Sequence, residues 1–91
     1  MREREIERRL FSKVKTRGGL ACKFVSPGMR GMPDRVVLYK TKVAFVELKA
    51  PGEVPEPLQS KRRRQLEVQG FDVYTLDSME AVDAFIGDFC K

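Results

Sequence analysis

The chain has 91 residues, enough for one small domain whose hydrophobic core must be thin. It has 18 lysines and arginines against 13 aspartates and glutamates, and the net charge of +5 favours a polyanionic partner such as nucleic acid. It contains no histidine, which excludes Ser-His-Asp and Cys-His catalysis and metal sites built on histidine. Any catalysis must therefore use carboxylates, lysine, tyrosine, or a metal ion held by oxygen ligands.

The remaining composition is that of an ordinary globular protein. Cys22 and Cys90 lie far apart and form no CxxC pattern, so we expect neither a zinc site nor a disulfide. The N-terminus is charged rather than apolar, and no apolar run is long enough to span a bilayer. We therefore expect one domain over residues 1–91, located in the cytoplasm.

The first half of the chain predicts one helix and three strands. Apolar residues spaced as on one helical face predict a helix over 3–17, which ends at Gly18-Gly19. Residues 20–25 suit a strand, with Phe24 and Val25 covered. Residues 35–39 and 42–49 are rich in Val, Phe and Tyr, and the short link between them predicts an antiparallel hairpin. Their nearly continuous apolar runs are typical of strands buried on both faces.

The second half predicts a basic helix, a strand and a last helix. The basic helix runs from about 58 to 69 and ends at Gly70, and a strand follows over 71–76. Asp77 and Ser78 are candidate N-caps of the final helix, whose apolar stripe is Val82, Phe85, Ile86 and Phe89. The order α-β-β-β-α-β-α predicts an α/β fold in which helices cover both faces of a four-stranded mixed sheet.

The residues best suited to chemistry are Asp34, Glu47 and Lys49. Alternate residues of a strand share one face, so Glu47 and Lys49 point the same way, and the hairpin places Asp34 opposite the region of Glu47. Two neighbouring carboxylates repel each other unless a cation lies between them. A divalent metal ion fits this arrangement and activates water for phosphodiester hydrolysis, with Lys49 stabilising the phosphate and the Leu48 carbonyl as a further ligand.

Each part of this pattern also has an ordinary structural interpretation. A Glu-x-Lys triplet is common on exposed strand faces, and Pro-Asp is common turn chemistry. Glu7 lies on the inward side of the first helix, where it adds a third carboxylate or forms a surface ion pair. Gln59 either bonds to the site or only begins its helix. Several basic residues either follow a nucleic-acid backbone or form a solvated surface, namely Lys23, Arg30, Arg35, Lys61, Arg62, Arg63 and Arg64.

The segments GMPD at 31–34, VELKAPG at 46–52 and LQ at 58–59 together resemble the VRR-NUC domain of the PD-(D/E)XK nuclease superfamily. The resemblance covers nearly the whole chain. It implies that Asp34 and Glu47 bind Mg²⁺ or Mn²⁺, that Lys49 is the catalytic lysine, and that Gln59 is the motif glutamine. It also implies a glutamate on the first helix; Glu7 suits the inward face better than its rival Glu3.

Stand-alone members of this family are short, often come from phages, and are similar to Holliday-junction resolvases that act as homodimers on branched DNA. The resemblance therefore implies a homodimeric, structure-specific DNA endonuclease of DNA repair, in the cytosol of a bacterium or phage-infected host. Two alternatives stay open: a non-catalytic nucleic-acid-binding module on the same fold, and a protein-interaction subunit whose basic face is incidental.

Overall fold

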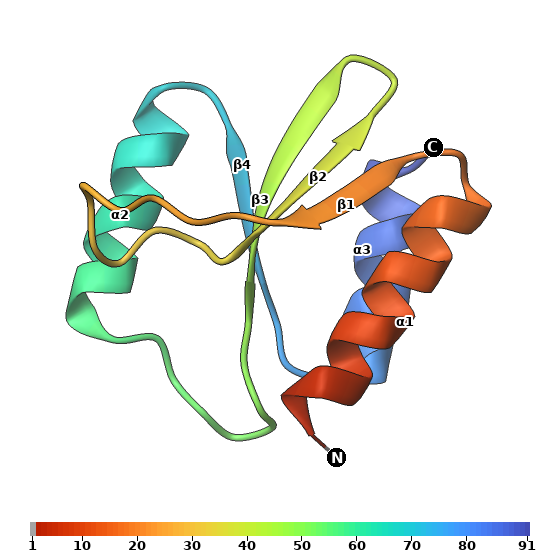
Figure 1. Cartoon of the computed structure of the whole chain (residues 1–91), viewed down its shortest axis with the longest axis horizontal. Coiled ribbons are helices and arrows are strands. Elements are labelled where there is room, and N and C mark those ends of the chain that lie inside the picture. Colours follow the sequence, from red (N-terminus) through yellow and green to blue (C-terminus); the bar gives the residue numbers. More distant parts are fainter. Residues whose placement is uncertain (1) are drawn as a thin grey trace.

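The computed structural model describes residues 2–91, and these form three helices and four strands in the predicted order (Figure 1). For the elements whose bounds were predicted, each boundary lies within two residues of its prediction. None of the helices in this range is both long and apolar enough to cross a membrane. In chain order the elements are α1 (Glu3–Thr16), β1 (Leu20–Lys23), β2 (Arg35–Tyr39), β3 (Lys42–Leu48), α2 (Pro57–Val68), β4 (Asp72–Leu76) and α3 (Met79–Phe89).

The strands form one mixed sheet in the order β1-β2-β3-β4, which confirms the predicted α/β class. The β1–β2 and β2–β3 pairs are antiparallel, and β4 lies parallel to β3. A parallel pair needs a crossover connection, and α2 supplies it. The β2–β3 hairpin turns through Lys40 and Thr41, which both have positive φ angles, as a two-residue turn of this hand requires.

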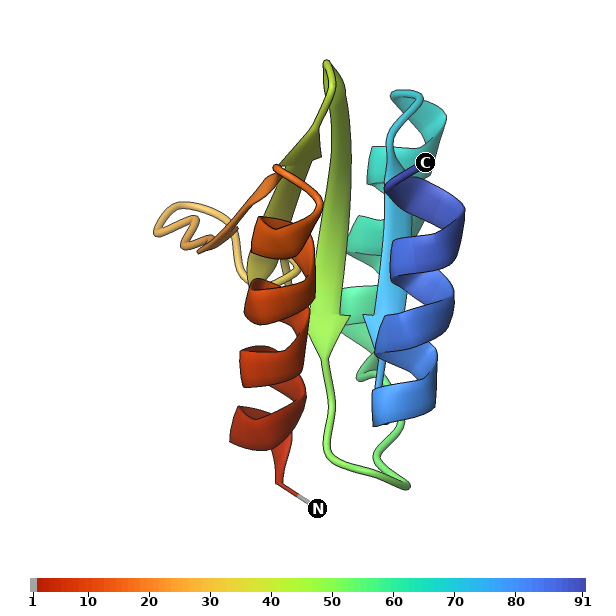
Figure 2. The ribbon, with the colours of Figure 1, turned by 90° about the vertical axis from the view of Figure 1, so that its right-hand side faces the viewer.

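The hydrophobic core lies between one face of the sheet and the helices α1 and α3. These two helices lie side by side over that face (Figure 2). The predicted stripe of α3 is buried, and Ser78 caps this helix by accepting a hydrogen bond from the Ala81 amide. The free cysteine Cys90 is also buried. The buried residues of α1 are Ile6, Leu10 and Val14, and those of the sheet include Val37, Ala44, Val46, Leu48 and Leu76.

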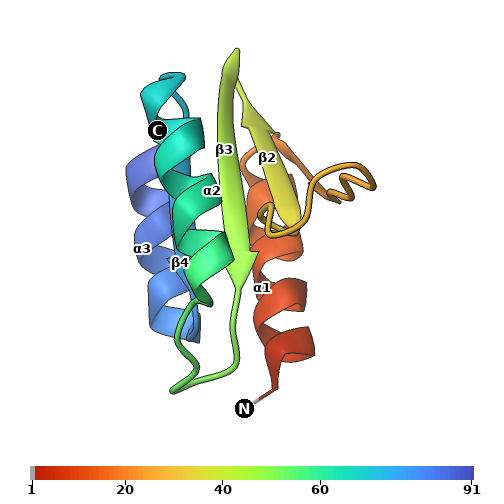
Figure 3. The ribbon, with the colours of Figure 1, turned by 90° about the vertical axis from the view of Figure 1, so that its left-hand side faces the viewer.

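The opposite face of the sheet is only partly covered, because α2 lies along β4 rather than across the other strands (Figure 3). Helix α2 has no buried residue at all. Leu20 on β1 is 58% exposed and Leu38 on β2 is 39% exposed. The prediction that these strands are buried on both faces is therefore wrong for this side of β2. Val25, which was also predicted to be covered, lies beyond the end of β1 and is 79% exposed.

The end of β3 and the start of α1 lie at the same end of the molecule (Figures 1 and 2). Strand β3 runs toward this end, and the loop to α2 begins there. The first turn of α1 therefore lies beside the last residues of β3. This arrangement brings side chains from the hairpin, from α1 and from α2 within reach of one another.

Candidate active site

Asp34 and Glu47 lie opposite each other where the β2–β3 hairpin ends, as the predicted register required. Arg35 pairs with Val46, so the next residues outward, Asp34 and Glu47, share the face of the sheet that α2 borders. The Leu48 amide donates a hydrogen bond of 3.2 Å to Oδ1 of Asp34. This bond holds the Asp34 side chain against the end of β3. Two carboxylates, one just before β2 and one on β3, are thus fixed beside each other.

The Glu47 side chain is the charged group buried at this site, with 9% of the residue exposed. Burial is the largest cause that raises the pKa of Glu47 from 4.5 to about 7, and the neighbouring Asp34 charge is the next. The Lys49 ammonium and the Arg35 guanidinium act in the opposite direction. Oε1 of Glu47 is buried and has no hydrogen-bond partner among residues 2–91. An unsatisfied buried carboxylate oxygen of this kind is costly unless a cation or water meets it.

Gln59 connects α2 to this carboxylate. Its Nε2 donates a hydrogen bond of 3.2 Å to Oε2 of Glu47. Its Oε1 accepts a hydrogen bond of 2.9 Å from the Glu56 amide, which closes a capping box at the start of α2. The Gln59 amide group therefore does two things at once: it caps the start of α2 and it contacts Glu47.

A small cavity of about 100 Å³ opens beside Glu47. Thr75 and Arg63 line it together with Gln59, and Nη1 of Arg63 donates a hydrogen bond of 3.3 Å to Oγ1 of Thr75. Thr75 is the cross-strand partner of Glu47 on β4. Thr75 could not be predicted as a neighbour of Glu47, because the register of a parallel strand after a helical crossover has no local signal in the sequence. Arg63 was expected on a nucleic-acid surface, and the structure places it at the edge of this cavity.

The two glutamates of α1 have different surroundings. Glu7 forms an ion pair with Arg35, whose side chain is only 12% exposed. Nη1 of Arg35 also lies 3.6 Å from Oδ2 of Asp34. Glu3 lies one turn earlier, and its charge is among the causes that raise the pKa of Glu47, whereas the charge of Glu7 is not. The structure therefore brings Asp34, Glu47, Lys49 and Gln59 together and joins Glu7 to them only through Arg35.

The donor set suits a divalent cation with oxygen ligands. Within residues 2–91 no three acidic, cysteine or histidine side chains gather closely enough to hold a metal ion by themselves. The protein offers two carboxylates, one of them with a buried unpaired oxygen, next to the backbone of Leu48. Mg²⁺ is commonly bound through one or two carboxylates, with water and phosphate oxygens completing its shell. The residues present fit such an ion.

Some side chains of the predicted basic surface form hydrogen bonds or ion pairs within residues 2–91, and others form none. Arg62 bonds to the Arg30 carbonyl and to Gln65, and Arg63 bonds to Glu67 and Thr75. Arg35 is held by Glu7 and has little surface to offer to a phosphate. Within the predicted set, the side chains that are exposed and form no ion pair or hydrogen bond with residues 2–91 are those of Lys23, Arg30, Lys61 and Arg64.

Comparison with known proteins gave two close likenesses, although no family model matches the sequence. The chain is 51% identical over 81 residues to "Putative nuclease p44" of Acyrthosiphon pisum secondary endosymbiont phage 1. That alignment covers 88% of this chain and 87% of the phage protein. The structure also matches a solved "VRR_NUC domain" with a TM-score of 0.87 and 27% sequence identity, over 96% of both chains.

Proposed function

Because the chain belongs to the VRR-NUC family of nuclease domains, we propose that it hydrolyses phosphodiester bonds of DNA and that this activity depends on Mg²⁺ or Mn²⁺. The observation that supports metal dependence is the pair Asp34 and Glu47. Their carboxylates lie on one face at one sheet end, and Oε1 of Glu47 is buried without a partner. The net charge of +5 supports a polyanionic substrate.

Asp34, Glu47 and the Leu48 carbonyl would hold the ion. The chemistry that such an ion supplies is acidification of a water molecule and neutralisation of phosphate charge. Asp34 is positioned for this by the Leu48 amide, and Glu47 by Gln59. A bound cation would also lower the pKa of Glu47 and so keep it ionised at neutral pH.

Lys49 is the proposed catalytic lysine. It follows Glu47 by two residues and so projects toward the same side, and its positive charge already acts on the Glu47 carboxyl. An ammonium in this place stabilises negative charge that develops on the phosphate or orients the attacking water. Arg63, at the edge of the cavity beside Glu47, is a second cation within reach of a bound phosphate group.

We further propose that the enzyme acts as a homodimer on branched DNA, with a four-way junction as the first substrate to try. The partly uncovered sheet face supports association, because Leu20, Leu38 and Phe71 remain substantially exposed there. Two active sites held at a fixed separation would select for the shape of the substrate rather than for its sequence. The mass of the wild type and of Leu38→Glu, measured in solution, tests the homodimer. We expect the wild type to be a dimer and Leu38→Glu to be a monomer. A monomeric wild type refutes the homodimer.

The test of the nuclease proposal is cleavage of supercoiled plasmid and of a four-way junction in Mg²⁺ or Mn²⁺. We expect cleavage by the wild type, loss with EDTA, and a fall of at least about 100-fold in Glu47→Gln and Lys49→Met. Glu80→Gln is the matched control, since Glu80 is an exposed acid at the start of α3. Cleavage that survives both site substitutions refutes the proposal. Salt-sensitive DNA binding without any cleavage would instead favour a binding module.

A further inference from the structure

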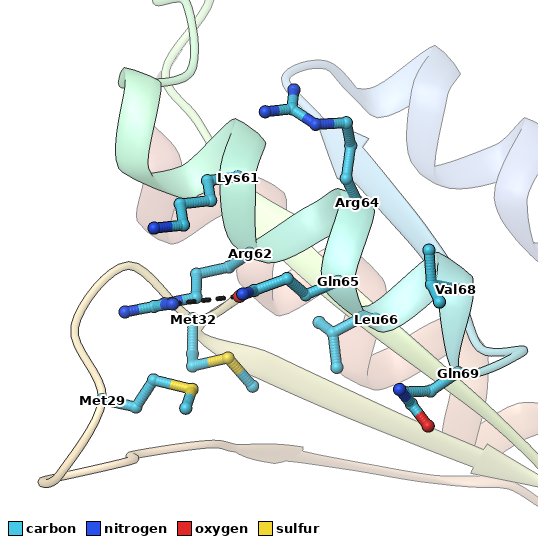
Figure 4. Close-up of a pocket in the computed structure, with 9 residues that line it drawn as sticks. All are labelled: Met29, Met32, Lys61, Arg62, Arg64, Gln65, Leu66, Val68 and Gln69. Atoms are coloured by element: carbon cyan, nitrogen blue, oxygen red, sulfur yellow. Dashed lines mark hydrogen bonds between the residues drawn. The ribbon is translucent and has the colours of Figure 1, made fainter.

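A groove of about 620 Å³ lies between α2 and the loop that joins β1 to β2 (Figure 4). Its apolar lining comes from Met29 and Met32 of the loop and from Leu66 and Val68 of α2. Met29 is 45% exposed and Val68 is 82% exposed, so apolar side chains face the solvent along this groove. Apolar surface that stays exposed beside a concave site commonly marks a place where a ligand is bound.

The remaining residues that line the groove are three cations and the two amides Gln65 and Gln69. Lys61, Arg62 and Arg64 line it, and no acidic side chain does. In Figure 4 Lys61 extends next to Arg62, whereas Arg64 extends on the side of α2 away from Met29 and Met32, and both are exposed. The ligand that matches this lining has negative charges next to flat apolar groups. A second copy of the same groove would bring like charges together, which disfavours a self-association contact here.

The walls of the groove are held in place. Nε of Arg62 donates a hydrogen bond of 2.8 Å to the Arg30 carbonyl, and its Nη1 donates one of 2.9 Å to Oε1 of Gln65. Gly31 packs against Leu58 so closely that a Cβ at position 31 would lie 2.6 Å from Cγ of Leu58. These contacts join the loop to α2, so the groove exists before any ligand binds and little ordering is needed on binding.

The groove borders the candidate active site, because adjacent residues line the two: Met32 lines the groove and Pro33 the cavity beside Glu47, and Arg62 and Arg63 divide in the same way. Met32 precedes Asp34 by two residues, and Lys61 follows Gln59 by two residues. Gln59 in turn bonds to Glu47. A polymer that lies along the groove would therefore pass close to the site where Asp34 and Glu47 meet.

We propose that this groove holds an unpaired stretch of the DNA strand beside the bond to be cut. Its bases lie against Met29, Met32, Leu66 and Val68, and its phosphates lie against Lys61 and Arg64. Bases in a duplex are stacked inside it and cannot contact the apolar lining of the groove, so they would leave it unused. Binding of a duplex through its phosphate backbone needs only cations. Methionine suits this role because its sulfur makes favourable contacts with aromatic rings. The inference rests on the proposed nuclease function and adds a substrate class: DNA with a single-stranded segment.

The experiment measures binding by fluorescence anisotropy in EDTA, so that no cleavage occurs. Three probes are compared: a blunt duplex, the same duplex with an unpaired overhang of about eight nucleotides, and one whose overhang contains only abasic sites. The variant is Met29→Ser/Val68→Ser, because both side chains are exposed and their loss leaves the core intact. The control is Val25→Ser/Val54→Ser, since these valines are 79% and 78% exposed and lie outside the groove.

We expect the wild type and the control to bind the overhang with bases about fivefold or more tightly than the abasic overhang. The groove variant should lose this preference and bind the blunt duplex as the wild type does. Equal affinity of the wild type for the two overhangs, or a preference that survives in the groove variant, overturns the inference. Cleavage of blunt duplex in Mg²⁺ is recorded separately. If the protein cleaves DNA but binds both overhangs equally, only this inference fails. If it prefers the overhang with bases but does not cleave DNA, only the proposed nuclease function fails.

Discussion

Glu47 combines burial with an acidic neighbour, and this should make the stability of the protein depend on pH. Its pKa is about 7 in the folded chain, against 4.5 ordinarily. A raised folded-state pKa means that its stabilising effect is complete below about pH 4.5 and is lost as the pH rises through about 7. The effect is at most about 3 kcal/mol in the absence of a divalent ion.

Urea denaturation in EDTA at about pH 5 and about pH 8 tests this pH dependence. Wild type should lose roughly 2–3 kcal/mol more stability between these values than Glu47→Gln, which stays neutral throughout. Subtracting the variant from the wild type removes the contribution of the other carboxyl groups. An identical pH dependence in both proteins would show that Glu47 titrates as an exposed glutamate does.

The two glutamates of α1 make different predictions. Glu3 acts electrostatically on Glu47, whereas Glu7 is committed to Arg35. Glu3→Gln should therefore lower the cleavage rate by about tenfold with little change in stability, as expected when a charge near a metal site is removed. Glu7→Gln removes the closer of the two carboxylates that pair with the buried Arg35, so it should lower the melting temperature as well. If both variants melted at the same temperature and only Glu7→Gln cleaved more slowly, Glu7 rather than Glu3 would be the glutamate that acts on the site.

At the scale of the element, the loop between β1 and β2 depends on Gly31. This residue has φ +83°, and a Cβ there would clash with Leu58. Gly31→Ala should therefore cost about 1–3 kcal/mol and reduce cleavage, because the same loop positions Asp34. Gly28→Ala in the same loop is the control, since a Cβ at that position meets nothing within 4 Å. Denaturation curves of the two variants that coincide would contradict this account.

The order and type of the elements could be predicted from the sequence because the helical and strand patterns differ in period. The hairpin register, and with it the opposition of Asp34 and Glu47, followed from the short Lys40-Thr41 turn. The placement of α2 could not be predicted, since its few apolar residues do not specify which strand it covers. Its position along β4 leaves Leu38 exposed and brings Arg63 to Thr75.

For the whole molecule, the net charge of +5 should make DNA binding depend strongly on salt. Lys61 and Arg64 are exposed and form no ion pair with another residue in 2–91. The affinity for DNA falls as salt rises, so the slope of log affinity against log salt is negative. Replacing both residues with glutamine should make this slope less steep by about 2. Replacing Arg9, which is paired with Asp83 on α3, should leave the slope unchanged. A slope that does not respond to the double substitution would place the DNA elsewhere on the molecule.

The central claim is that residues 34 and 47 together bind a divalent cation, and titration of the protein with Mn²⁺ followed by electron paramagnetic resonance tests it most directly. The wild type should remove free Mn²⁺ from solution, and Asp34→Asn and Glu47→Gln should each weaken this by about tenfold or more. Glu80→Gln should bind as the wild type does. If the double variant Asp34→Asn/Glu47→Gln still bound Mn²⁺ with wild-type affinity, these carboxylates would not form the metal site.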